Sequence, residues 1–67
     1  MRLIVNGQER SSEAACLAEL WQAETGAAAP QGFAIALNGD VVRAAHWDET
    51  TINDGDRVEI IRAVAGG

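Results

Sequence analysis

The sequence has no lysine and no tyrosine, and it contains only one cysteine, one histidine and one proline. Without lysine, no side-chain amine is available to form a Schiff base or to accept an acyl group. The single cysteine, Cys16, excludes an internal disulfide and a set of thiolates that could hold structural zinc. A reducing compartment suits such a chain, and we predict a cytoplasmic protein.

Basic residues are scarce as well. Five arginines stand against ten acidic residues, which gives a formal net charge of -5. This sign disfavours a phosphate-binding surface, so nucleic acid is not an expected partner. Apolar runs are too short for a signal peptide or a membrane span, so no membrane association is expected. The 67 residues suffice for one small domain, which we predict over residues 1–67.

Two Asn-Gly pairs, Asn6-Gly7 and Asn38-Gly39, are the clearest local signals in the sequence. Both residues of such a pair tolerate the positive φ of a tight hairpin turn, so each pair predicts a β-hairpin. The flanking strands are predicted at residues 3–5 and 8–11, and at residues 33–37 and 40–43. A last strand is predicted at residues 57–64, after a turn rich in Asp and Asn.

Between the two hairpins the apolar spacing becomes helical, and Gly26 supplies a stop. Propensity alone starts this helix at Ser12. A second interpretation starts it at Cys16, where Cys16 and Glu19 occupy the positions of a capping box. Leu17, Leu20 and Trp21 form the apolar stripe of the helix in either case.

The first and last strands carry apolar residues on both faces over part of their length, as central strands do. Side by side they make a mixed sheet of four to five strands, with the one main helix packed on one face. The predicted fold class is therefore α+β, in the β-grasp arrangement.

The inventory of catalytic side chains is thin. Cys16 and His46 could form a nucleophile and base pair, and His46 with Asp48 and Glu49 could hold a metal ion. We favour a structural cysteine, a surface histidine and no metal site, and we predict that Trp47 packs on the core. The chain is therefore not expected to be an enzyme.

The printed sequence ends in Gly66-Gly67, directly after the predicted last strand. Four residues beyond a rigid strand can reach roughly 13 Å, and glycines fit a narrow channel because they lack Cβ. We predict a flexible tail in which Val64, Ala65 and Gly66 enter the active sites of partner enzymes. The terminal carboxylate of Gly67 is an anion at neutral pH and needs activation before it can react as an acyl donor.

Several segments together resemble the sulfur carrier proteins of thiamine biosynthesis, over essentially the whole chain. They are the stretches 5–7, 16–21, 35–39 and 52–60 and the end at 64–67. The resemblance implies a ubiquitin-like fold and no bound cofactor. It also implies a cycle in which a ubiquitin-activating-type adenylating enzyme uses ATP on Gly67, a persulfide donor supplies sulfur, and the resulting thiocarboxylate serves a thiazole synthase. The family usually has Thr at the position of Cys16, which favours the later helix start.

Two other functions remain open at this point. The small subunit of molybdopterin synthase is a related carrier with the same Gly-Gly end, and a non-covalent ubiquitin-like interaction module would not use the glycines. For any of these functions the acidic balance suggests basic partner surfaces. We predict docking through the sheet face opposite the helix, with Ile61 and Arg62 near the tail.

Overall fold

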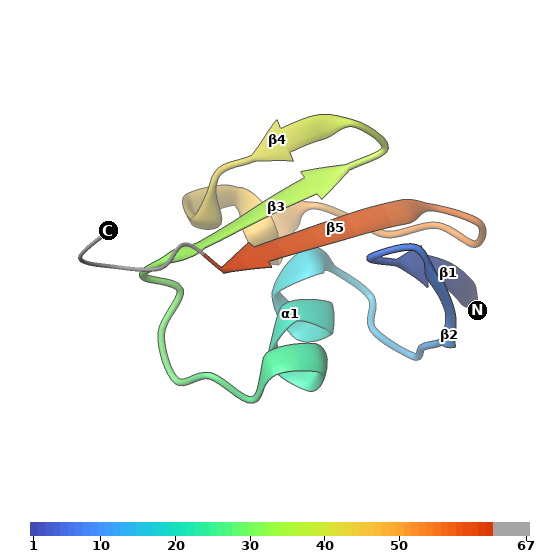
Figure 1. Cartoon of the computed structure of the whole chain (residues 1–67), viewed down its shortest axis with the longest axis horizontal. Coiled ribbons are helices and arrows are strands. Elements are labelled where there is room, and N and C mark those ends of the chain that lie inside the picture. The colour runs from blue at the N-terminus through green and yellow to red at the C-terminus, as the bar shows by residue number, and fades with distance from the viewer. Residues whose placement is uncertain (63–67) are drawn as a thin grey trace.

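The computed structural model describes residues 1–62, and its elements follow the predicted order of hairpin, helix, hairpin and strand (Figure 1). Their bounds are β1 (Arg2–Val5), β2 (Gln8–Ser11), α1 (Leu17–Thr25), β3 (Phe33–Leu37), β4 (Asp40–Val42), the 3-10 helix η1 (Ala44–Glu49) and β5 (Arg57–Arg62). Residues 63 and 64, which complete the predicted last strand, lie outside the described residues. Among residues 1–62, no helix has the length and apolarity needed to cross a membrane.

The five strands form one sheet in the order β2-β1-β5-β3-β4. β1 and β5 run parallel, and the pairs β1–β2, β3–β4 and β3–β5 run antiparallel. The mixed sheet is therefore confirmed, with β5 at its centre and β1 beside it. All four residues of β2 are exposed, as expected of a polar edge strand.

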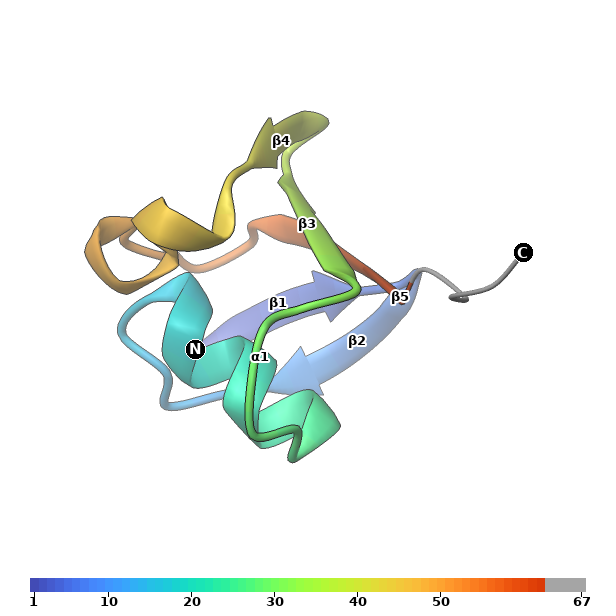
Figure 2. The ribbon, with the colours of Figure 1, turned by 90° about the vertical axis from the view of Figure 1, so that its left-hand side faces the viewer.

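The core lies between the sheet and the two helical elements, on one side of the sheet (Figures 1 and 2). α1 buries the predicted stripe of Leu17, Leu20 and Trp21 there. Trp47 of η1 is buried too, its ring centroid 5.4 Å from that of Trp21. Its Nε1–H donates to the backbone oxygen of Val42 at 2.8 Å. The packing role predicted for Trp47 is therefore confirmed.

The helix begins at Leu17 with Cys16 as its N-cap residue, so the later start is correct. The capping-box interpretation is wrong in its chemistry, because the Cys16 side chain makes no capping hydrogen bond. The Leu17 N–H donates instead to the Thr50 carbonyl oxygen at 3.1 Å. The Glu19 carboxylate accepts from the N–H of Ala15, one residue before the cap, at 2.8 Å. The neighbouring segment at Thr50 thus satisfies the first of the amides that have no partner within the helix.

Both hairpin turns have the predicted backbone. Asn6 and Asn38 have φ values of 50° and 51°, and the glycines that follow them have φ values of 80° and 90°. Positive φ at both central residues is the property that makes Asn-Gly suitable for a two-residue hairpin turn.

Candidate functional site

The strand that precedes the C-terminal residues is the central strand of the sheet. Arg62, the last described residue, is the register partner of Phe33 at the start of β3. The residues predicted to carry the chemistry, Val64, Ala65, Gly66 and Gly67, lie outside the described residues. The candidate site consists of the surface around the end of β5, from which those residues continue.

Ile61 and Arg62 lie on opposite faces of the sheet, because side chains alternate along a strand. The Arg62 guanidinium carbon lies 5.6 Å from the centroid of the Phe33 ring, which itself contacts Trp21 edge to face. Arg62 therefore belongs to the helix side, and the prediction that it shares the opposite face with Ile61 is wrong. No observation tests whether either residue docks a partner, so that role stays a prediction.

The sheet face away from α1, here called the open face, combines apolar and charged side chains. Its large apolar residues are Ile4, Val41 and Ile61, which are 36%, 75% and 54% exposed. Cross-strand partners place Ile4 beside Arg57, and Val41 in line with Ala36 and Glu59. The open face is therefore defined by Ile4, Ala34, Ala36, Val41, Arg57, Glu59 and Ile61.

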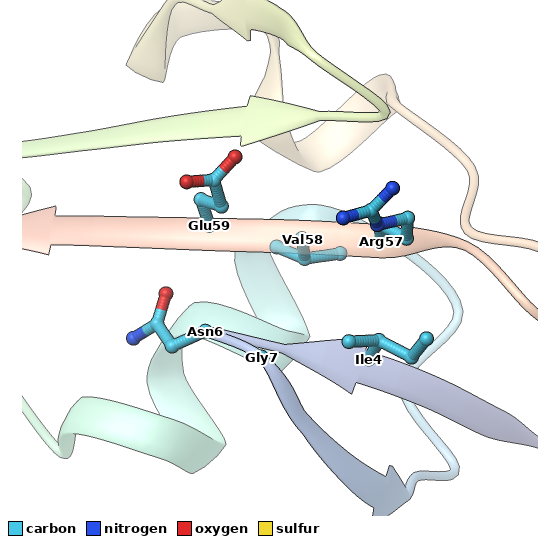
Figure 3. A pocket seen from close by; sticks show the side chains of 6 residues that line it. All are labelled: Ile4, Asn6, Gly7, Arg57, Val58 and Glu59. Carbon is cyan, nitrogen blue, oxygen red and sulfur yellow. The ribbon is translucent and has the colours of Figure 1, made fainter.

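A shallow depression of about 230 Å³ lies where β1 and β5 meet. Figure 3 shows the Ile4 and Asn6 side chains beside β1 and the charged Arg57 and Glu59 side chains on β5. Gly7 and Val58 complete the lining. The depression offers a cation, an anion and apolar contact area within one small region, a composition suited to protein recognition.

The residues weighed for catalysis occupy the other side of the molecule. His46 of η1 is exposed, and its Nδ1 lies 2.7 Å from a carboxylate oxygen of Glu49. Cys16 is half-buried at the start of α1. Within residues 1–62, no three His, Cys, Asp or Glu side chains are grouped so that they could hold a metal ion.

The sequence did not reveal that the Asn6 and Asn38 side chains hydrogen-bond to β5. Asn6 Oδ1 accepts from the Ile60 N–H at 2.8 Å, and Asn6 Nδ2 donates to the Ile60 carbonyl at 3.2 Å. Asn38 Oδ1 accepts from the Arg57 N–H at 2.9 Å. The Asn-Gly signal predicts the turn but not the partner of the amide, which lies 54 positions away for Asn6 and 19 for Asn38.

Comparisons with known proteins agree with this fold. Residues 3–67 match the model of the ThiS family. The crystal structure of the thiamine biosynthesis protein ThiS from Geobacter metallireducens is 34% identical, with a TM-score of 0.80 and full coverage of both chains. The solution structure of a thiamine biosynthesis protein from the same organism is also 34% identical, with a TM-score of 0.78 over 100% of this chain and 88% of that one.

A thiazole synthase from Paramagnetospirillum magneticum is 31% identical over all 67 residues of this chain, which span 20% of that protein. Its similarity is therefore confined to about a fifth of its length. Family match and structural similarity extend over nearly the whole chain, and they agree with the mixed five-stranded sheet and its one α-helix. The chain therefore belongs to the ThiS family, the ubiquitin-like β-grasp sulfur carriers of thiamine biosynthesis.

Proposed function

We propose that the functional group of this carrier is the C-terminal carboxylate of Gly67, which is adenylated and then converted to a thiocarboxylate that donates sulfur to the thiazole ring. The observation that carries the proposal is the family match, which runs through to residue 67 and includes both terminal glycines. Family members carry sulfur for other enzymes, so the activation chemistry belongs to partners and not to side chains of this chain.

The proposed formation of the thiocarboxylate has three steps. The Gly67 carboxylate attacks the α-phosphorus of ATP, pyrophosphate leaves, and an acyl-adenylate forms. The terminal sulfur of a persulfide then attacks the acyl carbon and displaces AMP, which gives an acyl disulfide. A thiol attacks the donor's sulfur in that disulfide, so the thiocarboxylate leaves and a new disulfide forms between the thiol and the sulfur donor. Adenylation is needed because a carboxylate anion is a poor electrophile and AMP is a good leaving group.

The fold supports this chemistry by the place it gives to β5. β5 pairs with β1 at Arg57 and Val58 and with β3 from Val58 to Arg62, so the ladder to β3 holds Arg62 opposite Phe33. The five residues after Arg62 could span at most about 18 Å if extended. A partner that docks on the open face can therefore have its active site within reach of Gly67. Glycines at the end permit close approach, because no Cβ obstructs the acyl carbon.

We infer two enzyme partners, a ubiquitin-activating-type adenylating enzyme and a thiazole synthase. The thiazole synthase from Paramagnetospirillum magneticum supports the second, because about a fifth of that protein resembles this chain. Two activities joined in one polypeptide in one species commonly work together as separate chains in another. Ile61, the exposed second-to-last residue of β5, is the apolar contact that we assign to docking.

The test is the intact mass of the protein after incubation with the adenylating enzyme, ATP and a persulfide donor. The expected change corresponds to one oxygen replaced by sulfur. A variant with one extra residue after Gly67 is the control, and it should stay unmodified with an unchanged fold. An unmodified wild-type protein would contradict the proposal. A pull-down with the carrier as bait identifies the partner that receives the sulfur, and we expect it to capture thiazole synthase. Capture of the large molybdopterin synthase subunit instead would assign the carrier to molybdopterin synthesis.

A further inference from the structure

The Asn6 side chain continues the hydrogen-bond ladder between β1 and β5 beyond the end of β1. β1 stops at Val5, and the positive φ of Asn6 turns the chain into the hairpin. The Asn6 N–H still donates to the Val58 carbonyl at 2.9 Å, as the next residue of a parallel ladder would. In a regular ladder the Asn6 carbonyl would then accept from the Ile60 N–H. Here Asn6 Oδ1 takes that place at 2.8 Å.

The same side chain also binds the Ile60 carbonyl through Nδ2 at 3.2 Å. One amide group therefore satisfies both backbone polar groups of Ile60 on the β1 side. Among the residues that the structure describes, these hydrogen bonds from the β1–β2 hairpin reach furthest along β5. Ile60 is two residues before Arg62, so the Asn6 amide acts close to the end of the strand.

The second hairpin provides a matched case at the other end of β5. The Asn38 N–H donates to the Arg57 carbonyl at 2.7 Å, and Asn38 Oδ1 accepts from the Arg57 N–H at 2.9 Å. Its φ of 51° equals that of Asn6 within one degree. The two asparagines therefore have the same turn conformation, and the Oδ1 of each accepts from a β5 N–H, but Asn38 holds the strand start and Asn6 holds its end. They differ in the second bond of the amide, because Asn38 Nδ2 donates to the Asp56 carboxylate at 3.1 Å and not to β5.

We propose that Asn6 is a positioning residue, which holds Ile60 against β1 and thereby fixes the place of Arg62, from which the segment ending in Gly67 continues. This inference rests on the proposed function for its consequence in sulfur transfer. Without the Asn6 amide, the end of β5 keeps its ladder to β3 but loses its attachment on the β1 side. A reactive carboxylate whose point of origin moves spends less time in the geometry that reaction requires.

The test compares Asn6→Gly with Asn38→Gly. Glycine adopts positive φ freely, so each substitution removes the amide without straining the turn. Each also adds the same backbone freedom to the unfolded chain, so the two variants are matched in that respect. Circular dichroism and the denaturation midpoint establish that both variants fold.

Amide hydrogen exchange tests whether the Asn6 amide holds Ile60, and this measurement needs no partner protein. In Asn6→Gly, exchange at Ile60 should accelerate roughly tenfold relative to wild type, with little change at Arg57. In Asn38→Gly the pattern should reverse. Equal acceleration at both amides in both variants, or unchanged exchange at Ile60 in Asn6→Gly, would overturn the proposal.

Steady-state kinetics of acyl-adenylate formation by the adenylating enzyme test whether Asn6 contributes to the reaction of Gly67. For Asn6→Gly, kcat should fall roughly threefold to tenfold with KM unchanged, and Asn38→Gly should keep the wild-type kcat. A rise in KM alone would overturn positioning and assign Asn6 to the docking depression instead. A wild-type protein that is never adenylated would contradict the proposed function, while the exchange data would still decide whether Asn6 holds Ile60.

Discussion

The two faces of the sheet carry similar apolar side chains but bury them to different degrees. On the helix side, Ile35 and Val58 are fully buried in one core cluster with Leu20 of α1, and all three residues are at most 1% exposed. On the open face, Ile61 is 54% and Val41 75% exposed, and the charged Glu59 and Arg57 share this face further along β5. Burial makes the first set the source of stability, whereas the second set gains little from folding and is available for contact with another protein.

This difference predicts that substitutions on the two faces separate stability from recognition. The largest effect on stability belongs to Leu20→Ala, because a cavity opens between α1 and the sheet. We expect a loss of about 2 to 5 kcal/mol in the free energy of unfolding, measured by chemical denaturation. Ile61→Ala, the control on the open face, should lose less than about 1 kcal/mol. Equal losses would show that the open face also stabilises the fold.

The second prediction concerns the open face itself. Ile61→Asp places a charge where we expect a partner surface to close, so desolvation should raise the KM for adenylation or the Kd for thiazole synthase at least about tenfold. The free energy of unfolding should change little, because half of the Ile61 side chain already contacts solvent. Val41→Asp, at the β4 edge and away from Arg62, should have a smaller effect. Unchanged binding of both partners by Ile61→Asp would remove this face from the docking surface.

The third prediction concerns Arg62, which belongs to the helix side. Arg62→Gln removes the cation over the Phe33 ring, and we expect a loss of about 0.5 to 1 kcal/mol in the free energy of unfolding. Charge reversal by Arg62→Glu should cost a similar amount, and the predicted docking role of Arg62 requires that it also weaken partner binding. Unchanged partner affinity in Arg62→Glu would confine this arginine to its contact with Phe33.

The smallest effect is expected at the start of α1. Cys16→Thr supplies a hydroxyl where the thiol makes no capping bond, so the protein should gain up to about 1 kcal/mol. The hydroxyl would accept from the N–H of Ala18 or Glu19, and not from the Leu17 N–H, which is already bonded to the Thr50 carbonyl. A clear loss of stability on denaturation would show that the thiol is needed for packing.

The sequence predicted those parts of the fold whose signals are local. The Asn-Gly turns and the stripe of Leu17, Leu20 and Trp21 follow from turn conformation and helical spacing. One long-range feature, the place of β1 beside β5, was also predictable, because both strands are apolar on both faces over part of their length. The β-grasp arrangement was predictable because a sheet with one apolar helix has few ways to close a single core.

Features that depend on contacts between distant residues were not predictable in this way. The amide partners of Asn6 and Asn38 depend on where β5 lies between the hairpins. The orientation of Arg62 depends on the strand register, which sets Arg62 opposite Phe33, and a shift by one residue would reverse its face. The cap of α1 depends on a carbonyl from Thr50, which no motif around Cys16 indicates.

The most direct test of the central claim locates the sulfur within the chain. Because the protein has arginine but no lysine, trypsin cleavage after Arg62 releases residues 63–67 as one peptide. After incubation with the adenylating enzyme, ATP and a persulfide donor, we predict that this peptide alone gains the mass of sulfur in exchange for oxygen, with fragmentation placing it on Gly67. Sulfur on the peptide that contains Cys16, with residues 63–67 unmodified, would contradict the account.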